Sequence, residues 1–103
     1  MILHLATFRW RDDVTDDAVG ALTDALTEMA SALPMLRSYV CGPTLGVRPG
    51  GTDYAVAAIV DDADALVAYL DSPQHKAVYE NHLGGMVAER SAAQLPLAEG
   101  AFS

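Results

Sequence analysis

Strand-like and helix-like patterns follow one another along this chain in the order β, α, β, β, α, β. The strand-like segments are short and mostly apolar, and they cover residues 2–10, 36–41 and 54–60, with a last strand somewhere between Arg90 and Leu97. Side chains alternate between the two faces of a strand, so His4, Phe8 and Trp10 are expected on one face of the first strand. This order predicts one sheet with helices packed against it.

The longest helical pattern follows the acidic turn at Asp12 and Asp13. Thr15 is expected to cap this helix, and Asp16 and Asp17 stand in its first turn, where the helix dipole favours negative charge. Apolar residues then recur every three or four positions until Pro34 ends the helix: Val19, Leu22, Leu26, Met29 and Leu33. The residues between them, Thr23, Asp24, Thr27 and Glu28, are expected to face water.

The second helical region is broken in two. Asp61 and Asp62 open a short helix that runs through Tyr69 and Leu70. Ser72 and Pro73 then read as the cap and first residue of another helix, which Gly84 and Gly85 break: it carries Gln74, His75, Val78, Tyr79 and His82. With both regions placed, the pattern predicts an α+β fold of the ferredoxin-like βαββαβ type with a four-stranded antiparallel sheet.

One face of this sheet remains apolar where no helix is expected to cover it. Leu3 and Leu5 of the first strand and Ala55, Ala57 and Ile59 of the third strand would meet water there in a monomer. Exposed apolar patches of this kind usually mark interfaces, and packing two sheets face to face would cover this one. We therefore expect a homodimer that forms through the sheet face.

Length and charge narrow the classes of function. We expect the 103 residues to form a single domain, and the net charge of −8 with a pI near 4.4 argues against binding to nucleic acid or to an anionic membrane.

Residues Met1 to Trp10 are too short an apolar run for a signal peptide, which leads us to expect a cytoplasmic protein. Cys41 is the single cysteine, in a strand-like segment, and is expected to be an inert, buried thiol.

Few side chains in the sequence suit chemistry, and they are His4, Tyr69, His75, Tyr79 and His82. His75 falls in the first turn of its helix, where the dipole disfavours a positive charge, so its pKa should be lowered and its neutral imidazole could act as a general base. The structural alternatives are that His75 belongs only to the capping turn, that His4 is a hydrogen-bonded core residue and that Tyr69 fills the core.

His75, Tyr79 and His82 recur on one helix face, an arrangement that could hold a metal ion together with His4. No carboxylate stands nearby at ligand spacing, so we predict no metal. The glycines at 46, 50 and 51 lie between two strands rather than before a helix, so no phosphate-binding loop is predicted.

Three segments resemble the stress-responsive dimeric α/β-barrel (Dabb) family. The first is residues 4–13, with an early histidine and a basic-aromatic pair; the second is residues 42–54; the third is residues 69–75, which match the family's Tyr-x-x-x-Pro-x-His pattern. The resemblance covers nearly the whole chain and implies a dimeric α+β barrel with a pocket between each sheet and its helices.

The family includes a plant polyketide cyclase that makes olivetolic acid, and similarity to it implies roles for individual residues. His75 would be the general base, Tyr69 would donate a hydrogen bond to the developing oxyanion and His4 would orient the substrate. Phe8, Trp10, Tyr79 and His82 would contact the substrate, and no cofactor would be needed.

Three functions remain open on the sequence. The first is a cofactor-independent, polyketide cyclase-like enzyme acting on a small hydrophobic carbonyl compound by intramolecular aldol or Claisen chemistry. The second is a non-catalytic, stress-associated dimer that binds a small hydrophobic ligand. The third is a cofactor-free monooxygenase, in which Trp10, Tyr69 and Tyr79 would help to activate the substrate.

Overall fold

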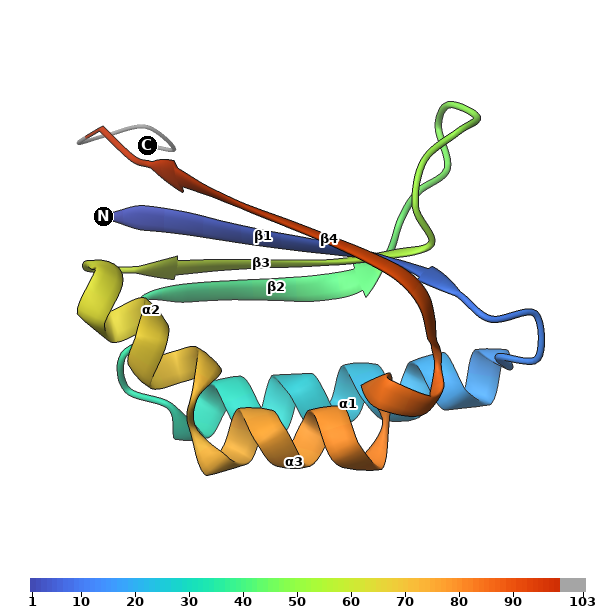
Figure 1. The fold of residues 1–103 in the computed structure, drawn as a ribbon, viewed down its shortest axis with the longest axis horizontal. Helices are drawn as coiled ribbons and strands as arrows, with labels where there is room; N and C mark the ends of the chain where they lie inside the picture. The colour runs from blue at the N-terminus through green and yellow to red at the C-terminus, as the bar shows by residue number, and fades with distance from the viewer. Residues whose placement is uncertain (99–103) are drawn as a thin grey trace.

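A single antiparallel sheet packs against helices on one of its two faces (Figure 1). The structure is a computed structural model, and it describes residues 1–98. Within these residues the elements are β1 (Ile2–Trp10), α1 (Asp16–Ala32), β2 (Ser38–Pro43), β3 (Tyr54–Val60), α2 (Ala63–Leu70), α3 (Pro73–Asn81) and β4 (Val87–Pro96), with a 3₁₀ turn at Leu83–Gly85. The predicted α+β, ferredoxin-like fold is confirmed.

The strands lie in the order β2-β3-β1-β4, and each neighbouring pair is antiparallel. Directly opposed residues point to the same face, so the register arranges side chains in rows across the sheet. One row on the helix side contains Tyr39, Ala58, His4 and Gln94, one from each strand. The register of β1 with β4 thus brings Gln94, which is 90 positions later in the sequence, beside His4.

Two strand boundaries differ from the prediction. β2 begins at Ser38 rather than at Leu36, because Leu36 lies in a turn where its N–H donates to the carbonyl of Leu33 at 3.2 Å. β4 begins at Val87 rather than near Arg90. It is an edge strand with almost all of its side chains exposed, so no apolar alternation marks its start.

The long helix α1 holds the core against the sheet. It buries Leu22, Leu26 and Met29, and the hydroxyl of Thr15 accepts from the backbone N–H of Ala18 at 3.1 Å, as expected of a cap. The prediction that Thr23 faces water is wrong: its hydroxyl lies 2.7 Å from that of the buried Tyr54 and satisfies it. Among residues 1–98, no helix is long and apolar enough to cross a membrane.

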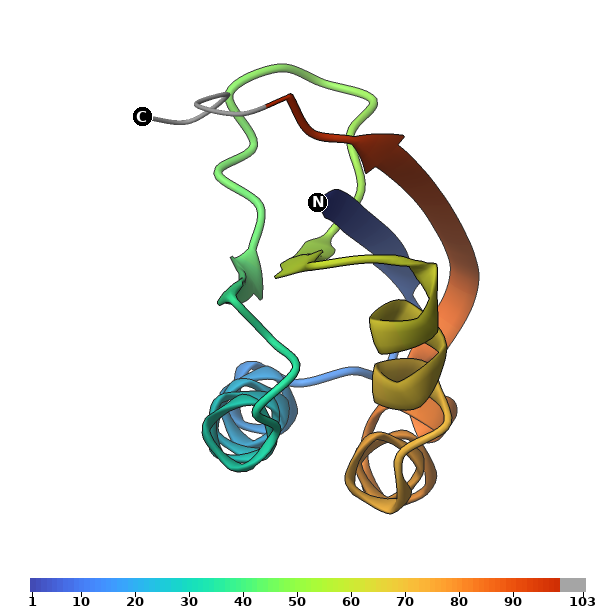
Figure 2. The same cartoon turned by 90° about the vertical axis from the view of Figure 1, so that its left-hand side faces the viewer.

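The opposite face of the sheet carries no helix. Leu5 lies in its middle, in a row with Val40, Ala57 and Ala93, and Val40 is 65% exposed. The connection between β2 and β3, residues 44–53, rises on this same side of the sheet, away from the helices (Figure 2). The apolar face anticipated from the sequence is therefore present and uncovered in a single chain.

Candidate functional site

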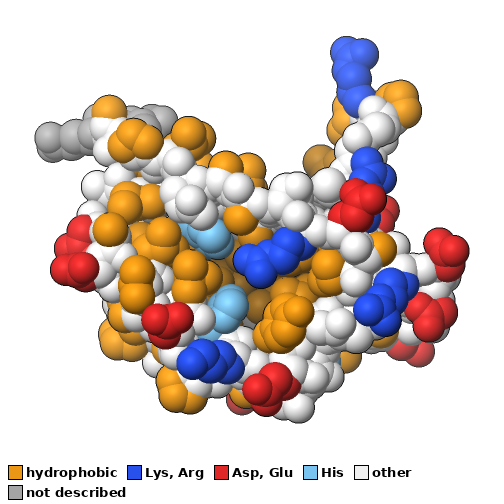
Figure 3. Space-filling model, viewed as in Figure 1, with side chains coloured by type: hydrophobic (Ala, Val, Ile, Leu, Met, Phe, Trp, Pro, Cys, Tyr) orange, Lys and Arg blue, Asp and Glu red, His pale blue; other side chains and the backbone are white. Residues whose placement is uncertain are grey.

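A pocket lies between the helix side of the sheet and the helices, and every strand and all three helices of residues 1–98 contribute to its lining. Its volume is about 40 Å³, enough for a few water molecules. Figure 3 shows this side of the molecule, where two histidine side chains and a basic side chain gather among hydrophobic ones at a hollow. Its lining residues are His4, Ala6, Phe8, Leu26, Tyr39, Val56, Tyr69, Leu70, His75, Tyr79, Leu83 and Arg90.

The junction between α2 and α3 places Tyr69 and His75. Ser72 is buried there, and its hydroxyl donates to the Tyr69 carbonyl at 2.8 Å and accepts from the His75 backbone N–H at 3.1 Å. Pro73 follows as the first residue of α3. One hydroxyl thus fixes both backbones, and the two side-chain rings meet edge to face with their centroids 5.1 Å apart.

His4 completes a cluster around Tyr69. The residue is 3% exposed, and its ring centroid lies 6.4 Å from that of Tyr69. The amide Nε2 of Gln94 lies 2.9 Å from His4 Nδ1. Because an amide N–H can only donate, Nδ1 accepts in this arrangement and the neutral ring carries its proton on Nε2. His4, Tyr69 and His75, the three residues predicted to be catalytic, therefore line one pocket.

Both histidines in the pocket favour the neutral form. Burial, followed by the positive charge of Arg90, lowers the pKa of His4. The pKa of His75 is lowered by burial, then by Arg90 and His4, while a hydrogen bond to the backbone of Leu70 and the charge of Asp71 oppose the shift. The lowered pKa of His75 expected from the sequence is confirmed in direction, but its main cause is burial rather than the helix dipole.

These shifts make the folded protein sensitive to mild acid. Because the folded pKa of His4 and of His75 lies below 6.5, the unfolded chain binds more protons as the pH falls below about 6.5, so folding stability is lost there. We expect the free energy of unfolding from urea titrations to be lower at pH 5.5 than at pH 7.5, with a shallower dependence in His75→Gln. NMR titration midpoints of both imidazoles at or above 6.5 would contradict this expectation.

Tyr39 is a pocket residue that the sequence reasoning missed. Its hydroxyl is buried and makes no hydrogen bond of normal geometry with residues 1–98, although the Tyr69 hydroxyl is near enough to affect its pKa and the two rings lie edge-on with their centroids 6.4 Å apart. Burial raises the pKa of both Tyr39 and Tyr69, so both hydroxyls keep their protons and remain able to donate. A buried hydroxyl without a partner is costly, and an oxygen atom of a bound ligand would satisfy it.

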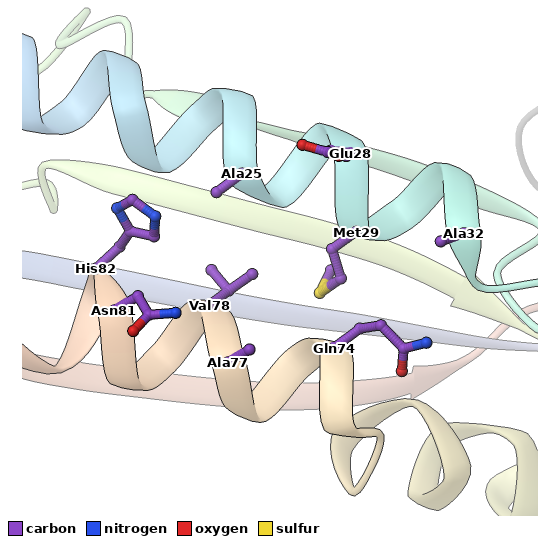
Figure 4. Close-up of a pocket in the computed structure, with 9 residues that line it drawn as sticks. All are labelled: Ala25, Glu28, Met29, Ala32, Gln74, Ala77, Val78, Asn81 and His82. Atoms are coloured by element: carbon purple, nitrogen blue, oxygen red, sulfur yellow. The ribbon is translucent and has the colours of Figure 1, made fainter.

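Two residues predicted to contact substrate lie outside this pocket. Trp10 stacks on Phe8 and packs against Tyr54 beyond the pocket, where the register of β1 with β4 shifts between Arg9 and Trp10. His82 instead lines a more open groove of about 300 Å³ between α1 and α3, together with short side chains such as Ala25 and Ala77 (Figure 4). Phe8 and Tyr79 do line the pocket.

The helix spacing of His75, Tyr79 and His82 does not produce a shared site. His75 faces the pocket under the sheet, whereas His82 faces the groove between the two helices. In the part of the chain that the structure describes, no three His, Cys, Asp or Glu side chains are grouped so that they could hold a metal ion.

This fold and sequence identify the family. The model of the stress responsive A/B barrel domain, Dabb, matches residues 2–95, and the chain belongs to that family. It is 37% identical over 79 residues to an uncharacterized protein of Streptomyces coelicolor, a match that covers 75% of this chain and 81% of that protein.

Two solved structures have a similar fold. A dimeric ferredoxin-like protein of unknown function from Thermobifida fusca is 41% identical, with a TM-score of 0.86 over 93% of this chain and 90% of that one. A hydroxynitrile lyase from Passiflora edulis has a TM-score of 0.80 over 95% of this chain and 94% of that one, at 12% identity. The second similarity is one of fold alone.

Proposed function

We propose that this chain is one domain that acts, as a homodimer, as a cofactor-independent enzyme on a small hydrophobic carbonyl compound. The reaction is carbon–carbon bond formation of the polyketide cyclase type, within one substrate molecule. The observation that carries the proposal is the cluster of His4, Tyr69 and His75 around a largely apolar pocket.

In this reaction His75 takes a proton from a carbon between two carbonyl groups. The resulting enolate attacks a third carbonyl of the same molecule, which forms the new carbon–carbon bond and leaves an alkoxide, and the proton on His75 returns to that alkoxide. The substrate is neither oxidised nor reduced overall, so the reaction needs no redox cofactor. The lowered pKa of His75 supports this role, because the ring is unprotonated and ready to accept at neutral pH.

Two tyrosine hydroxyls are available to stabilise the oxyanion. The Tyr69 ring packs edge to face against both histidine rings, and the hydroxyl of Tyr39 makes no hydrogen bond of normal geometry with the described residues. Hydrogen bonds to a developing negative charge stabilise the transition state more strongly in a buried site than in water. His4, held at Nδ1 by Gln94, has a fixed orientation against the substrate.

The size of the pocket limits the substrate. A volume of about 40 Å³ is well below that of typical ligand sites, so side chains must move when a ring-sized compound binds. Tyr79 is 46% exposed and packs over Gly84, where an added Cβ would lie 3.2 Å from its ring. Tyr79 and the exposed Arg90 are the lining residues free to move aside.

Proteins of similar structure support catalysis and dimer formation in general, but they do not indicate a particular reaction or interface. The protein from Passiflora edulis is a lyase of the same fold, so this scaffold is compatible with an active site. The Thermobifida fusca protein is dimeric, and the uncovered apolar face of the sheet in this chain supports the same assembly.

The proposal is tested with a panel of aryl-substituted 3,5,7-trioxo acids and esters, in which a carbon between two carbonyls can reach a third carbonyl and close a six-membered ring. Each compound is incubated with the purified protein, and products are identified by mass spectrometry and NMR while oxygen uptake is recorded. Cyclised products that retain the substrate's atoms, apart from lost water, are expected. Oxygen consumption would instead indicate a monooxygenase, and binding without any product would indicate a ligand-binding protein.

A further inference from the structure

We propose that the pocket recognises the carboxylate group of an organic acid, and that Arg90 binds it. This inference rests on the proposed function, because it specifies the substrate class of the same site as carbonyl compounds that carry a free carboxylate. Nothing in the motif that predicts His75 and Tyr69 points to such a group.

The register of the sheet directs Arg90 to the pocket side. Arg90 is opposite Phe8 in the pairing of β1 with β4, and Gln94 is opposite His4, so both β4 residues share the face that the helices cover. Arg90 lines the pocket at its exposed edge. Arg90 is therefore placed where a ligand enters, two rows along the same sheet face from Gln94, with the row of Ala6 and Ala92 between them.

Arg90 has no ion pair with any residue from 1 to 98. The adjacent Glu89 alternates to the other face of β4, where its carboxylate lies 3.7 Å from Arg9 Nε. The other ion pair in these residues joins Arg37 to Asp61. The charge of Arg90 is thus available to a ligand rather than used within the fold.

The charge around the pocket contrasts with that of the whole chain. The chain has 14 acidic and six basic residues, yet no aspartate or glutamate lines this pocket, whereas Arg90 and two histidines do. Arg90 acts on both rings, since its charge lowers the pKa of His4 and of His75. Asp71 is the acidic group that acts on His75, and it lies outside the lining. A pocket of this kind favours an anion.

A carboxylate fits better than a phosphate. One guanidinium neutralises one negative charge and presents two parallel N–H donors, which match the two oxygens of a carboxylate. A phosphate dianion would bring a second charge for which no further lysine or arginine lines the pocket. With the carboxylate held at the rim, the neighbouring carbonyl carbons extend inward toward His75 and the tyrosine hydroxyls.

The experiment compares carboxylates with their amides, which have nearly the same shape but no charge. Acetate, phenylacetate and 3-phenylpropanoate, each with its amide, are titrated into the full-length protein and followed by NMR. Wild type is expected to bind at least one carboxylate about tenfold to a hundredfold more tightly than its amide. Arg90→Gln should remove this preference, and Arg90→Lys should keep part of it.

Arg48→Gln is the matched control, because it removes the same charge from the exposed β2–β3 connection and should keep the preference. The bound carboxylate should also raise the NMR titration midpoints of His4 and His75 in wild type, because it offsets Arg90, and the amide should not. Equal affinity for carboxylate and amide, or no carboxylate binding across the series, would overturn the proposal. A preference that depends on Arg90 in a protein without turnover would keep the carboxylate site and reject the enzyme.

Discussion

Replacing His75 with alanine is expected to reduce turnover of a cyclising trioxo acid by about 10²–10⁴-fold. In the proposed reaction His75 accepts the carbon-bound proton, and burial with the nearby Arg90 favours its neutral ring. The fold should survive, because the cap of α3 uses the backbone N–H of His75 and not its side chain. Initial rates at saturating substrate, measured with far-UV circular dichroism on the same samples, check the expectation.

Lys76→Ala is the matched control for that substitution. Lys76 is the next residue on α3, is exposed and does not line the pocket, so its loss should leave the rate unchanged. Tyr69→Phe removes only the hydroxyl and should slow turnover while retaining substrate binding, as expected for an oxyanion donor. Turnover by His75→Ala at the wild-type rate would exclude His75 as the base and would indicate that His75 belongs only to the capping turn of α3.

The fold was predictable because each element carries local signals. The three-and-four spacing of Leu22, Leu26 and Met29 and the cap at Thr15 are properties of the chain near each residue, and all are found in the structure. The boundaries that failed are those with little local signal. β4 is an edge strand with exposed side chains, and no sequence pattern marks its first residue, Val87.

The site was predictable only in part, for a related physical reason. His75 and Tyr69 lie within one short segment joined by Ser72, so the sequence already places them together. Tyr39, Gln94 and Arg90 come from the two edge strands and reach the pocket through the register of the sheet, which local patterns do not fix. Once the register of β4 against β1 is known, it is clear that Gln94 lies opposite His4 and that Arg90 lies opposite Phe8.

The same limitation explains the two residues that the structure places elsewhere. Trp10 shares a strand face with His4 and Phe8 by alternation, but the register shift after Arg9 and its stacking on Phe8 place its ring beyond the pocket. His82 lies on the same helix face as His75 by spacing, yet α3 separates the pocket from the groove beside α1. Periodicity assigns a face, and packing decides which space that face meets.

The second large effect is expected at the uncovered face of the sheet, where Leu5→Lys should turn the proposed dimer into monomers. Leu5 lies in the central row with Val40, Ala57 and Ala93, none of which could pair with an ammonium group. A two-fold symmetric interface buries the substituted residue twice. At several kcal/mol for each unpaired buried charge, the dissociation constant should rise by about 10³-fold or more. Analytical ultracentrifugation across a concentration series measures it.

Leu5 is 37% exposed in the single chain, so the substitution disturbs the interface more than the core, and circular dichroism should show an intact fold. Val67→Lys is the control, since Val67 is 56% exposed on α2, on the other side of the molecule, and should leave the dimer unchanged. A dimer that persists in Leu5→Lys with its wild-type dissociation constant would place the interface elsewhere. The lining residues His4, Tyr69 and His75 all come from one chain, so a folded monomer that still turns over substrate would show that the dimer stabilises the sheet and does not complete the site.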